Sequence, residues 1–352
     1  MSRRQHGSRS CGPYGGVVDQ PIAVFAAAEL DAHAEPAGHP ERRGRLDASL
    51  AGIPAAGLVD ACRVVTPRLA TIDELNRVHD PRLVERIQQL CAAGGGSIDA
   101  DTYAAAGSWD TARRAAGAVL DSVDALSRGE CDLAFAASRP PGHHAEAAQS
   151  MGFCLFNNVA VAAAALVDRG ERVAIVDWDV HHGNGTQDIF YDEPNVLYVS
   201  THQSPLYPGT GRLTETGSDL APFANLNLPL PPGTRGDVYR QAFDEVIAPV
   251  IEGFAPTWLI ISAGYDAHRN DPLAEMQLTS SDYADLALRL QRLVPAQRLI
   301  VVLEGGYDFD ALSLSTGATL SALSGESFRP EAVSCGEVGA AAVTAARQLW
   351  EL

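Results

Sequence analysis

The chain has 352 residues, which leaves room for one large α/β domain or two small ones, and its content of 46% hydrophobic and 20% charged residues is typical of a globular protein. Its formal net charge of −18 disfavours binding to a nucleic-acid backbone and would steer cationic molecules toward the protein. No apolar stretch of the sequence reaches the length that spans a bilayer. We therefore expect neither a nucleic acid nor a membrane as a partner.

The N-terminal segment 1–20 contains Arg3, Arg4 and Arg9 but no apolar run behind them, which argues against a secretory signal. Glycine, serine and arginine dominate this segment, so we expect a disordered lead-in over 1–20 and a single catalytic domain over 21–352. The six cysteines form no CxxC pair, which fits a reducing compartment better than a disulfide framework. The expected location is the cytoplasm.

Short apolar runs alternate with segments of helical periodicity along the chain, a pattern typical of a parallel α/β sheet. Apolar runs without polar alternation indicate strands that are buried on both faces. Asn157 is a predicted helix N-cap, and Thr279 with Asp282 resembles a capping box. The segment 201–234 is rich in Gly and Pro and is predicted to form long functional loops. The predicted strands are 22–25, 133–136, 172–176, 196–200, 258–262 and 299–303, and the predicted helices are 109–127, 158–169, 239–254, 281–294 and 337–352.

The predicted strand 172–176 is followed directly by the sequence DWDVHHGNG at 177–185. Side chains at positions i and i+2 of a strand point the same way. Asp177, Asp179 and His181 are therefore expected to project together where the strand ends, while His182 points elsewhere. Two carboxylates and an imidazole at one strand end suit a divalent metal ion.

Three other predicted strands also end in groups that can ligate, titrate or donate a proton. The strand 133–136 is followed by RPPGHH at 139–144, the strand 258–262 by Asp266, and the strand 299–303 by Glu304, two glycines and Tyr307. Ligands of open parallel sheets bind outside the carboxyl ends of the strands. We therefore expect these groups to meet in one site.

The residue types at these strand ends indicate hydrolysis of an amide or ester carbonyl. Asp179, His181 and Asp266 would give a metal ion three ligands and leave positions open for water and substrate. His143 and His144 could serve as general base and acid, because imidazole titrates near neutral pH. The tyrosine behind the two glycines could donate a hydrogen bond to a developing oxyanion.

These motifs resemble those of the zinc-dependent histone deacetylase superfamily, which includes acetylpolyamine amidohydrolases and acetoin-utilisation proteins. The resemblance covers about residues 22–325 and implies the arginase-like α/β fold of that family, a single domain with a central eight-stranded parallel sheet flanked by helices. The motifs that carry it are HPERRGRL at 39–46, RPPGHH at 139–144, GFCLFNN at 152–158, DWDVHHGNG at 177–185, PGTG at 208–211, SAGYDAHRNDPL at 262–273 and LEGGYD at 303–308.

The resemblance implies a role for each residue of the site and two bound cations. The divalent ion is expected to be Zn²⁺, with Fe²⁺ or another divalent ion as an alternative, and a structural K⁺ or Na⁺ is expected beside it. By role, the resemblance assigns the metal ligands to Asp179, His181 and Asp266, catalysis to His143, His144 and Tyr307, support of the histidines to Asp177 and Asn184, the substrate tunnel to Gly152, Phe153, Tyr207, Leu273 and Asp101, and the monovalent cation to Asp177, Asp179, His181 and Ser200.

Asn184 departs from a common pattern of the family, because many members have a second aspartate at this position beside His144, and the departure resembles the class II branch. An amide lends no negative charge, so His144 should stay neutral more easily than His143. We hypothesise that His144 is the base and His143 the more cationic partner.

The expected function is that of a metal-dependent amidohydrolase that removes an acetyl or other acyl group from the lysine side chain of a peptide or protein, or from a small amine. An acetylpolyamine amidohydrolase is the alternative within the class. Polyamine specialists often carry a long insertion in an early loop, whereas the segment 92–108 is short and favours an open tunnel mouth. A non-catalytic zinc-binding interaction protein is the alternative outside the class, and the sequence leaves a homo-oligomer open.

Overall fold

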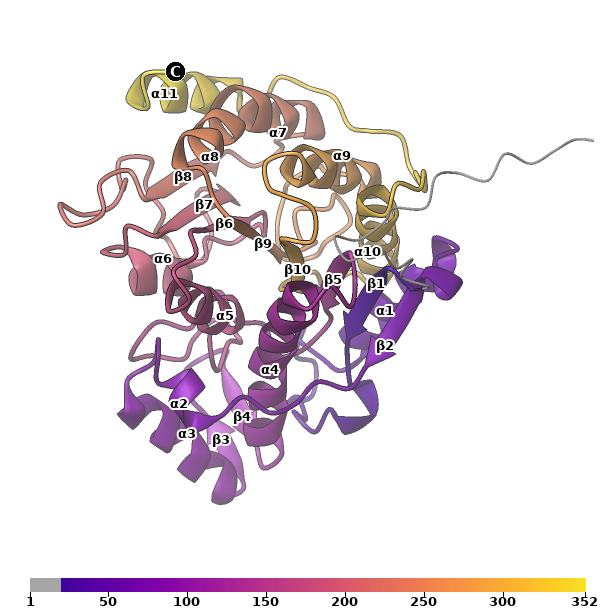
Figure 1. Cartoon of the computed structure of the whole chain (residues 1–352), viewed down its shortest axis with the longest axis vertical. Coiled ribbons are helices and arrows are strands. Elements are labelled where there is room, and N and C mark those ends of the chain that lie inside the picture. Colours follow the sequence, from indigo (N-terminus) through magenta and orange to yellow (C-terminus); the bar gives the residue numbers. More distant parts are fainter. Residues whose placement is uncertain (1–19) are drawn as a thin grey trace, which may run out of the picture.

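A computed structural model describes residues 20–352, so the predicted lead-in lies outside the described residues except for Gln20. The centre of the described part is an eight-stranded sheet with the order β2-β1-β5-β10-β9-β6-β7-β8 (Figure 1). Every pair of neighbouring strands in this sheet is parallel. The predicted fold class, a single α/β domain around an eight-stranded parallel sheet, is confirmed.

All six predicted strands are present, because their apolar runs are buried on both faces of the sheet. The structure extends three of them at the carboxyl end, to Asp177, Gln203 and Ala263. The eight strands are β1 (Ile22–Phe25), β2 (Cys62–Val65), β5 (Leu133–Ala136), β6 (Val173–Asp177), β7 (Val196–Gln203), β8 (Asn225–Leu230), β9 (Trp258–Ala263) and β10 (Leu299–Leu303).

The prediction of long loops over 201–234 holds for 204–224 and is wrong at two places, because β7 extends to Gln203 and β8 lies inside this segment. β8 is an edge strand that pairs with β7 alone, so it accommodates Pro229, which cannot donate to a second neighbour. The other edge strand, β2, was also not predicted. Two of its four residues are exposed, so it lacks the apolar run of a central strand.

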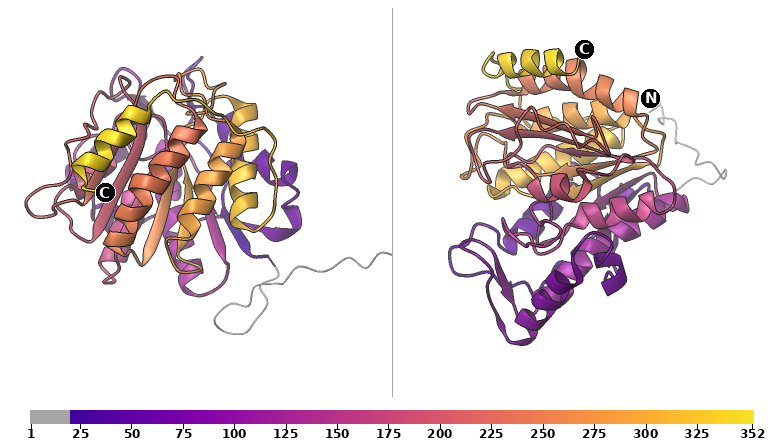
Figure 2. Two further views of the ribbon diagram at one scale, coloured as in Figure 1. Left: turned by 90° about the horizontal axis from the view of Figure 1, so that it is seen from above. Right: turned by 90° about the vertical axis from the view of Figure 1, so that its left-hand side faces the viewer.

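Helices cover both faces of the sheet and form three layers with it (Figure 2). Ile22 and Val24 of β1 point into one core, shared with α1, α9 and α10, whereas Ala23 and Phe25 point into the other, shared with α3, α4 and α5. The helices are α1 (Gly44–Ala55), α2 (Ile72–Leu75), α3 (Pro81–Ala92), α4 (Ser108–Ser127), α5 (Asn158–Val167), α6 (Asn184–Phe190), α7 (Gly236–Ala242), α8 (Ala248–Phe254), α9 (Ser280–Gln291), α10 (Phe309–Leu323) and α11 (Ala340–Leu349).

The predicted helices are all present, with shifts at their ends. α7 and α8 are joined by a π-helical turn at Phe243–Ile247, so the predicted helix 239–254 is one continuous helical segment. The Asn157 side chain caps α5 by accepting from the Ala160 N–H at 3.0 Å, as predicted. The Asp282 carboxylate likewise accepts from the Thr279 N–H at 2.9 Å at the start of α9.

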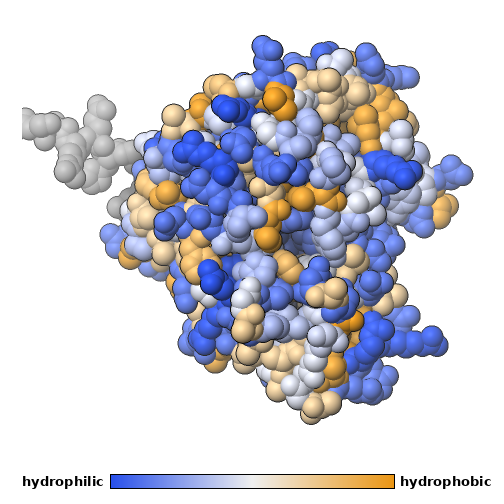
Figure 3. Space-filling view, turned by 180° about the vertical axis from the view of Figure 1, so that it is seen from behind, coloured by the Kyte–Doolittle hydropathy of each residue, from blue (hydrophilic) through white to orange (hydrophobic). Residues whose placement is uncertain are grey.

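The short segment 92–108 contains a small antiparallel hairpin of β3 (Gly95–Ser97) and β4 (Tyr103–Ala105), which was not predicted. No helix of the described part of the chain is long and apolar enough to cross a membrane. On the face shown in Figure 3, hydrophilic residues predominate and hydrophobic ones are scattered among them in small groups.

The strands whose ends carry the predicted site residues are direct neighbours in the sheet. Their order is β5-β10-β9-β6, and all of them are parallel. Their carboxyl ends therefore lie side by side at one edge of the sheet, which is where a parallel sheet binds its ligands.

Candidate active site

Three potential metal ligands converge beyond the ends of β6 and β9. One donor atom from each of Asp179, His181 and Asp266 lies within 4.8 Å of the other two, and all three residues are buried. The His181 Nδ1 atom lies 3.2 Å from an oxygen of each carboxylate. Asp179 and His181 follow β6, whereas Asp266 comes from the neighbouring strand β9 and approaches from the side.

The surroundings of these three side chains fit a divalent cation. A Cβ atom at Gly264 would lie 2.0 Å from the Asp179 Oδ2 atom, and one at Gly305 would lie 2.2 Å from the Asp266 Oδ2 atom, so only glycine leaves room for the carboxylates. Burial and the charge of Asp179 raise the pKa of Asp266, because two buried carboxylates repel each other. An ion of charge +2 held by Asp179, His181 and Asp266 would relieve this repulsion, and the oxygen-rich donor set suits Zn²⁺ or Fe²⁺.

The paired histidines of the loop after β5 lie beside this cluster. Their ring centroids are 4.0 Å apart. The His143 Nδ1 atom is 3.0 Å from the Asp177 Oδ2 atom, which also accepts the Tyr198 hydroxyl at 3.0 Å. The His144 Nδ1 atom is 2.8 Å from the Asn184 Oδ1 atom. Asp177 thus binds a histidine and the Asp179 N–H and is not part of the potential metal cluster, and the structure brings each histidine to the partner that the family resemblance implied.

The two histidines have opposite electrostatic surroundings. Burial lowers the pKa of His143, but the carboxylates of Asp179 and Asp177 outweigh it and raise the pKa to about 10. Burial, with the nearby rings of His143 and His181, holds the pKa of His144 well below its usual value. The surroundings of His143 therefore favour its cationic form, and those of His144 favour the neutral form.

The tautomer of His144 follows from Asn184. The amide nitrogen of Asn184 donates to the Glu146 Oε1 atom at 2.7 Å, which turns the amide oxygen toward His144. An amide oxygen can only accept, so the Nδ1 atom of His144 carries the proton and its Nε2 atom is left free to take one. This arrangement supports the hypothesis that His144 is the base.

Tyr307 follows β10 after Gly305 and Gly306 and is nearly buried, with 9% of its surface exposed. The Arg45 guanidinium lies over its ring at 4.8 Å from the centroid, and the Phe153 ring meets it edge-on at 5.9 Å. Tyr307 therefore contacts Arg45 and also Phe153, a residue of the predicted tunnel.

Gly152 and Tyr207 lie against the His144 ring, and Phe153 follows Gly152 in the chain. Gly152 has a positive φ of 56°, and a Cβ atom there would lie 2.4 Å from the His144 ring, so a larger residue would collide with the histidine. The Tyr207 ring meets the His144 ring edge-on at 5.1 Å and is 37% exposed. Tyr207 thus lies on the solvent-exposed side of His144.

Leu273 and Asp101, the other two residues of the predicted tunnel, are connected to the site only through intermediate residues. The Leu273 N–H donates to the Asp271 Oδ1 atom at 3.0 Å, and Asp271 in turn contacts the backbone of Tyr307. The His39 Nε2 atom lies 3.0 Å from the Asp101 carbonyl oxygen, and the His39 ring meets the Phe153 ring at 4.7 Å, so Asp101 is linked to the site through His39. Their roles in the tunnel stay predictions.

The predicted monovalent-cation site also stays a prediction. Asp177 of β6 and Ser200 of β7 are register partners, so their backbones lie together beneath Asp179 and His181. The Ser200 Oγ atom lies 2.9 Å from the His202 Nδ1 atom.

Glu304 is a buried site residue whose contacts sequence reasoning missed. Its Oε2 atom accepts from the Gly142 N–H at 2.6 Å and the His143 N–H at 3.2 Å, and its Oε1 atom accepts from the Ser262 hydroxyl at 3.1 Å. Burial raises its pKa to about 7. This carboxylate fastens the histidine loop to the end of β10.

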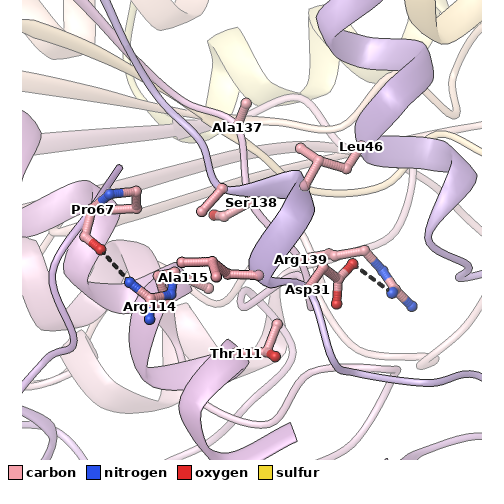
Figure 4. A pocket seen from close by; sticks show the side chains of 11 residues that line it. Asp31, Leu46, Pro67, Thr111, Arg114, Ala115, Ala137, Ser138 and Arg139 are labelled. Atoms are coloured by element: carbon pink, nitrogen blue, oxygen red, sulfur yellow. Dashed lines mark hydrogen bonds and ion pairs between the residues drawn. The ribbon is translucent and has the colours of Figure 1, made fainter. Parts of the chain in front are cut away.

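A buried ion-pair network holds the other end of the histidine loop. The Arg139 guanidinium lies 2.8 Å from the Asp31 Oδ2 atom and 2.7 Å from the Glu41 Oε2 atom. Figure 4 shows the ion pair with Asp31 beside a pocket that Leu46, Ser138 and Thr111 also line. In the sequence, this network is indicated only by the charged residues inside the motifs HPERRGRL and RPPGHH.

Two further residues near the site, His182 and Cys154, have surroundings that differ from those of the metal cluster and the histidine pair. His182 lies 2.8 Å from the Thr210 hydroxyl and 3.0 Å from the Gln187 Oε1 atom, and it is not among the potential metal ligands. Cys154 is buried, and burial raises the pKa of its thiol well above the usual value, so the thiolate is disfavoured.

The strand ends of the parallel sheet thus bring together an Asp-His-Asp cluster, two histidines and a tyrosine, the groups that metal-dependent hydrolysis of an amide requires. The family model of the histone deacetylase domain matches residues 39–323, and the chain belongs to this family. It is 40% identical over 300 residues to a probable deacetylase of Archaeoglobus fulgidus, covering 83% of each chain.

The other similar proteins agree with this assignment. The chain is 39% identical over 319 residues to a histone deacetylase-like amidohydrolase of Pseudomonas aeruginosa, covering 89% of this chain and 80% of that protein. Among solved structures, the crystal structure of the HDA15 HD domain matches with a TM-score of 0.87 and 37% identity, covering 93% of this chain and 95% of that one.

Proposed function

We propose that the protein is a metal-dependent deacetylase that hydrolyses the amide between an acetyl or other short acyl group and an amine, with the side chain of acetyl-lysine as the leading substrate. The observation that carries this proposal is the meeting of Asp179, His181, Asp266, the two histidines and Tyr307 at the ends of adjacent strands. The deacetylase and amidohydrolase names of the relatives support it.

The residues divide the work of amide hydrolysis among them. A divalent ion held by Asp179, His181 and Asp266 would supply Lewis acidity toward the carbonyl and lower the pKa of water. The Tyr307 hydroxyl would donate to the carbonyl oxygen as negative charge develops there. The free Nε2 atom of His144 would take a proton from the attacking water, and cationic His143 would give one to the departing amine.

The outer part of the site fits a narrow, partly apolar substrate. Phe153 and Tyr207 flank the approach to the histidines, and the net charge of −18 attracts a molecule that carries positive charge elsewhere. Peptides with acetyl-lysine and acetylated polyamines both meet these requirements. A panel of acetyl-lysine peptides against N-acetylated putrescine, cadaverine and spermidine, on protein of known metal content, separates the two.

Replacement of Tyr307 with phenylalanine is expected to lower kcat on a fluorogenic acetyl-lysine peptide by about 10²–10³-fold, because the ring stays and only the oxyanion donor is lost. The chain contains no lysine, so it carries no acetyl-lysine of its own into the assay. Tyr191→Phe, at the end of α6, is the control and should keep wild-type activity. A wild-type protein that turns over no faster than the Tyr307 variant would favour the non-catalytic zinc-binding alternative.

Replacement of Asn184 with aspartate is expected to shift the acidic limb of the pH profile of kcat/KM to higher pH, by about 1 unit or more. A carboxylate 2.8 Å from the His144 Nδ1 atom would stabilise the imidazolium and raise its pKa, and a base must be neutral to act. Because Asn184 donates to Glu146, the substitution is best made together with Glu146→Gln, and Glu146→Gln alone is the control. An unmoved acidic limb would exclude His144 as the base.

A further inference from the structure

Asp271 is a buried carboxylate whose acceptor atoms face backbone amides. Its Oδ2 atom accepts from the Tyr307 N–H at 2.7 Å and the Asp308 N–H at 3.4 Å, and its Oδ1 atom accepts from the Leu273 N–H at 3.0 Å. Only 6% of the residue is exposed, and no arginine of the described residues forms an ion pair with it. Burial and the charge of Asp266 raise the pKa of Asp271 to about 7, so the ionised carboxylate is disfavoured at this position.

This carboxylate joins two loops that carry different parts of the site. The loop after β9 holds Asp266 and continues through Asp271 to Leu273, and the loop after β10 holds Tyr307. The Tyr265 N–H donates to the Gly305 carbonyl at 3.0 Å, and the Tyr307 N–H bond to Asp271 adds a second tie between the two loops where the tyrosine side chain leaves the backbone.

The glycines before Tyr307 have their own anchors. The Gly305 N–H donates to the Asp179 Oδ2 atom at 2.8 Å, and the Gly306 carbonyl accepts from the Arg45 Nε atom at 2.6 Å. Gly306 has a φ of 118°, a backbone conformation that favours glycine. Asp271 is therefore the group that fixes the backbone of Tyr307 itself.

We propose that Asp271 is a positioning residue that holds Tyr307 where its hydroxyl can donate to the substrate carbonyl. The proposal rests on the proposed deacetylase function. A displacement of about 1 Å in a reacting group can lower the rate on the order of 10²-fold. Loss of the hydrogen bond between Asp271 and the Tyr307 N–H should therefore lower kcat, even though Asp271 does not touch the substrate.

The test is a double-mutant cycle between Asp271→Ala and Tyr307→Phe. In the wild-type background, Asp271→Ala should lower kcat by about 10–10²-fold with a smaller change in KM. In the Tyr307→Phe background it should have little further effect, because the donor that it positions is already gone. Asp271→Asn, whose amide oxygen can still accept from the Tyr307 N–H, should restore part of kcat.

The matched control is Asp237→Ala. Asp237 also bridges two segments through backbone amides, accepting from the Val238 N–H at 3.0 Å and the Gly336 N–H at 2.7 Å, but it lies outside the site. Asp237→Ala should leave kcat unchanged. The metal content of Asp271→Ala should equal that of the wild type, which separates an effect on Tyr307 from an effect on Asp266.

Amide hydrogen exchange gives a readout that needs no turnover. The peptide that contains residues 304–308 should exchange faster in Asp271→Ala than in the wild type, while peptides around Asp237 should not change. Wild-type kcat, multiplicative effects of the two substitutions, loss of metal or unchanged exchange in Asp271→Ala would each overturn the proposal. The proposed deacetylase function fails separately, when the wild type and Tyr307→Phe do not differ in turnover.

Discussion

Replacement of Asp266 with alanine is expected to remove the divalent metal and to lower kcat/KM for an acetyl-lysine peptide by about 10³-fold or more. Only Asp179 and His181 would remain as ligands, and both come from one strand end. Lewis-acid stabilisation of the carbonyl is worth several kcal/mol, and each 1.4 kcal/mol or so corresponds to a tenfold change in rate. The metal content of the purified protein and its kcat/KM should fall together.

Chelation provides the matching experiment on the wild-type chain. Removal of the metal should abolish turnover, and stepwise addition of Zn²⁺ or Fe²⁺ should restore it and identify the ion that supports it best. Asp310→Ala, an exposed position near the start of α10, is the control and should behave as the wild type. A full equivalent of metal bound to the Asp266→Ala protein would show that this residue is not a ligand.

Replacement of His144 with alanine is expected to lower kcat by about 10²–10⁴-fold, the usual contribution of general acid–base catalysis. His144 has the free Nε2 atom, the lowered pKa and the place between Gly152 and Tyr207 that a base for the attacking water requires. The substitution removes no metal ligand, so the metal content should stay at the wild-type level.

Added imidazole offers a check on this role, because it can occupy the space of the missing ring and take up the proton. It should restore part of the turnover of His144→Ala but none of that of Asp266→Ala. Wild-type kcat in His144→Ala would rule out the assigned role, and His143→Ala would then become the variant to examine.

The central part of the fold could be predicted from the sequence because its strands are buried on both faces. Such strands are continuous apolar runs, and the runs at 22–25, 133–136 and 299–303 coincide with β1, β5 and β10. The edge strands β2 and β8 could not be recognised in the same way, since one of their sides faces no partner strand and their sequences contain exposed or proline residues.

For the site, too, one part could be predicted from the sequence and another depends on the tertiary structure. Its chemical groups are local features of the sequence, because each follows an apolar run within a few residues. The spacing of Asp177, Asp179 and His181 showed that they leave one strand end together, but that spacing alone could not show which of them would meet a metal ion. The order of the strands decides this, since β9 lies beside β6 and brings Asp266 to Asp179 and His181, whereas β5 and its loop bring His143 to Asp177.

The contacts of Glu304 and Asp271 were decided by tertiary structure alone. Each carboxylate accepts from backbone amides of another loop, and an amide group is present at every non-proline residue, so no side-chain pattern marks such a partner in the sequence. The sequence by itself therefore determined which groups the strand ends carry. The packing of four parallel strands side by side determined which of those groups touch, because residues far apart in the chain meet only where the sheet brings their strands together.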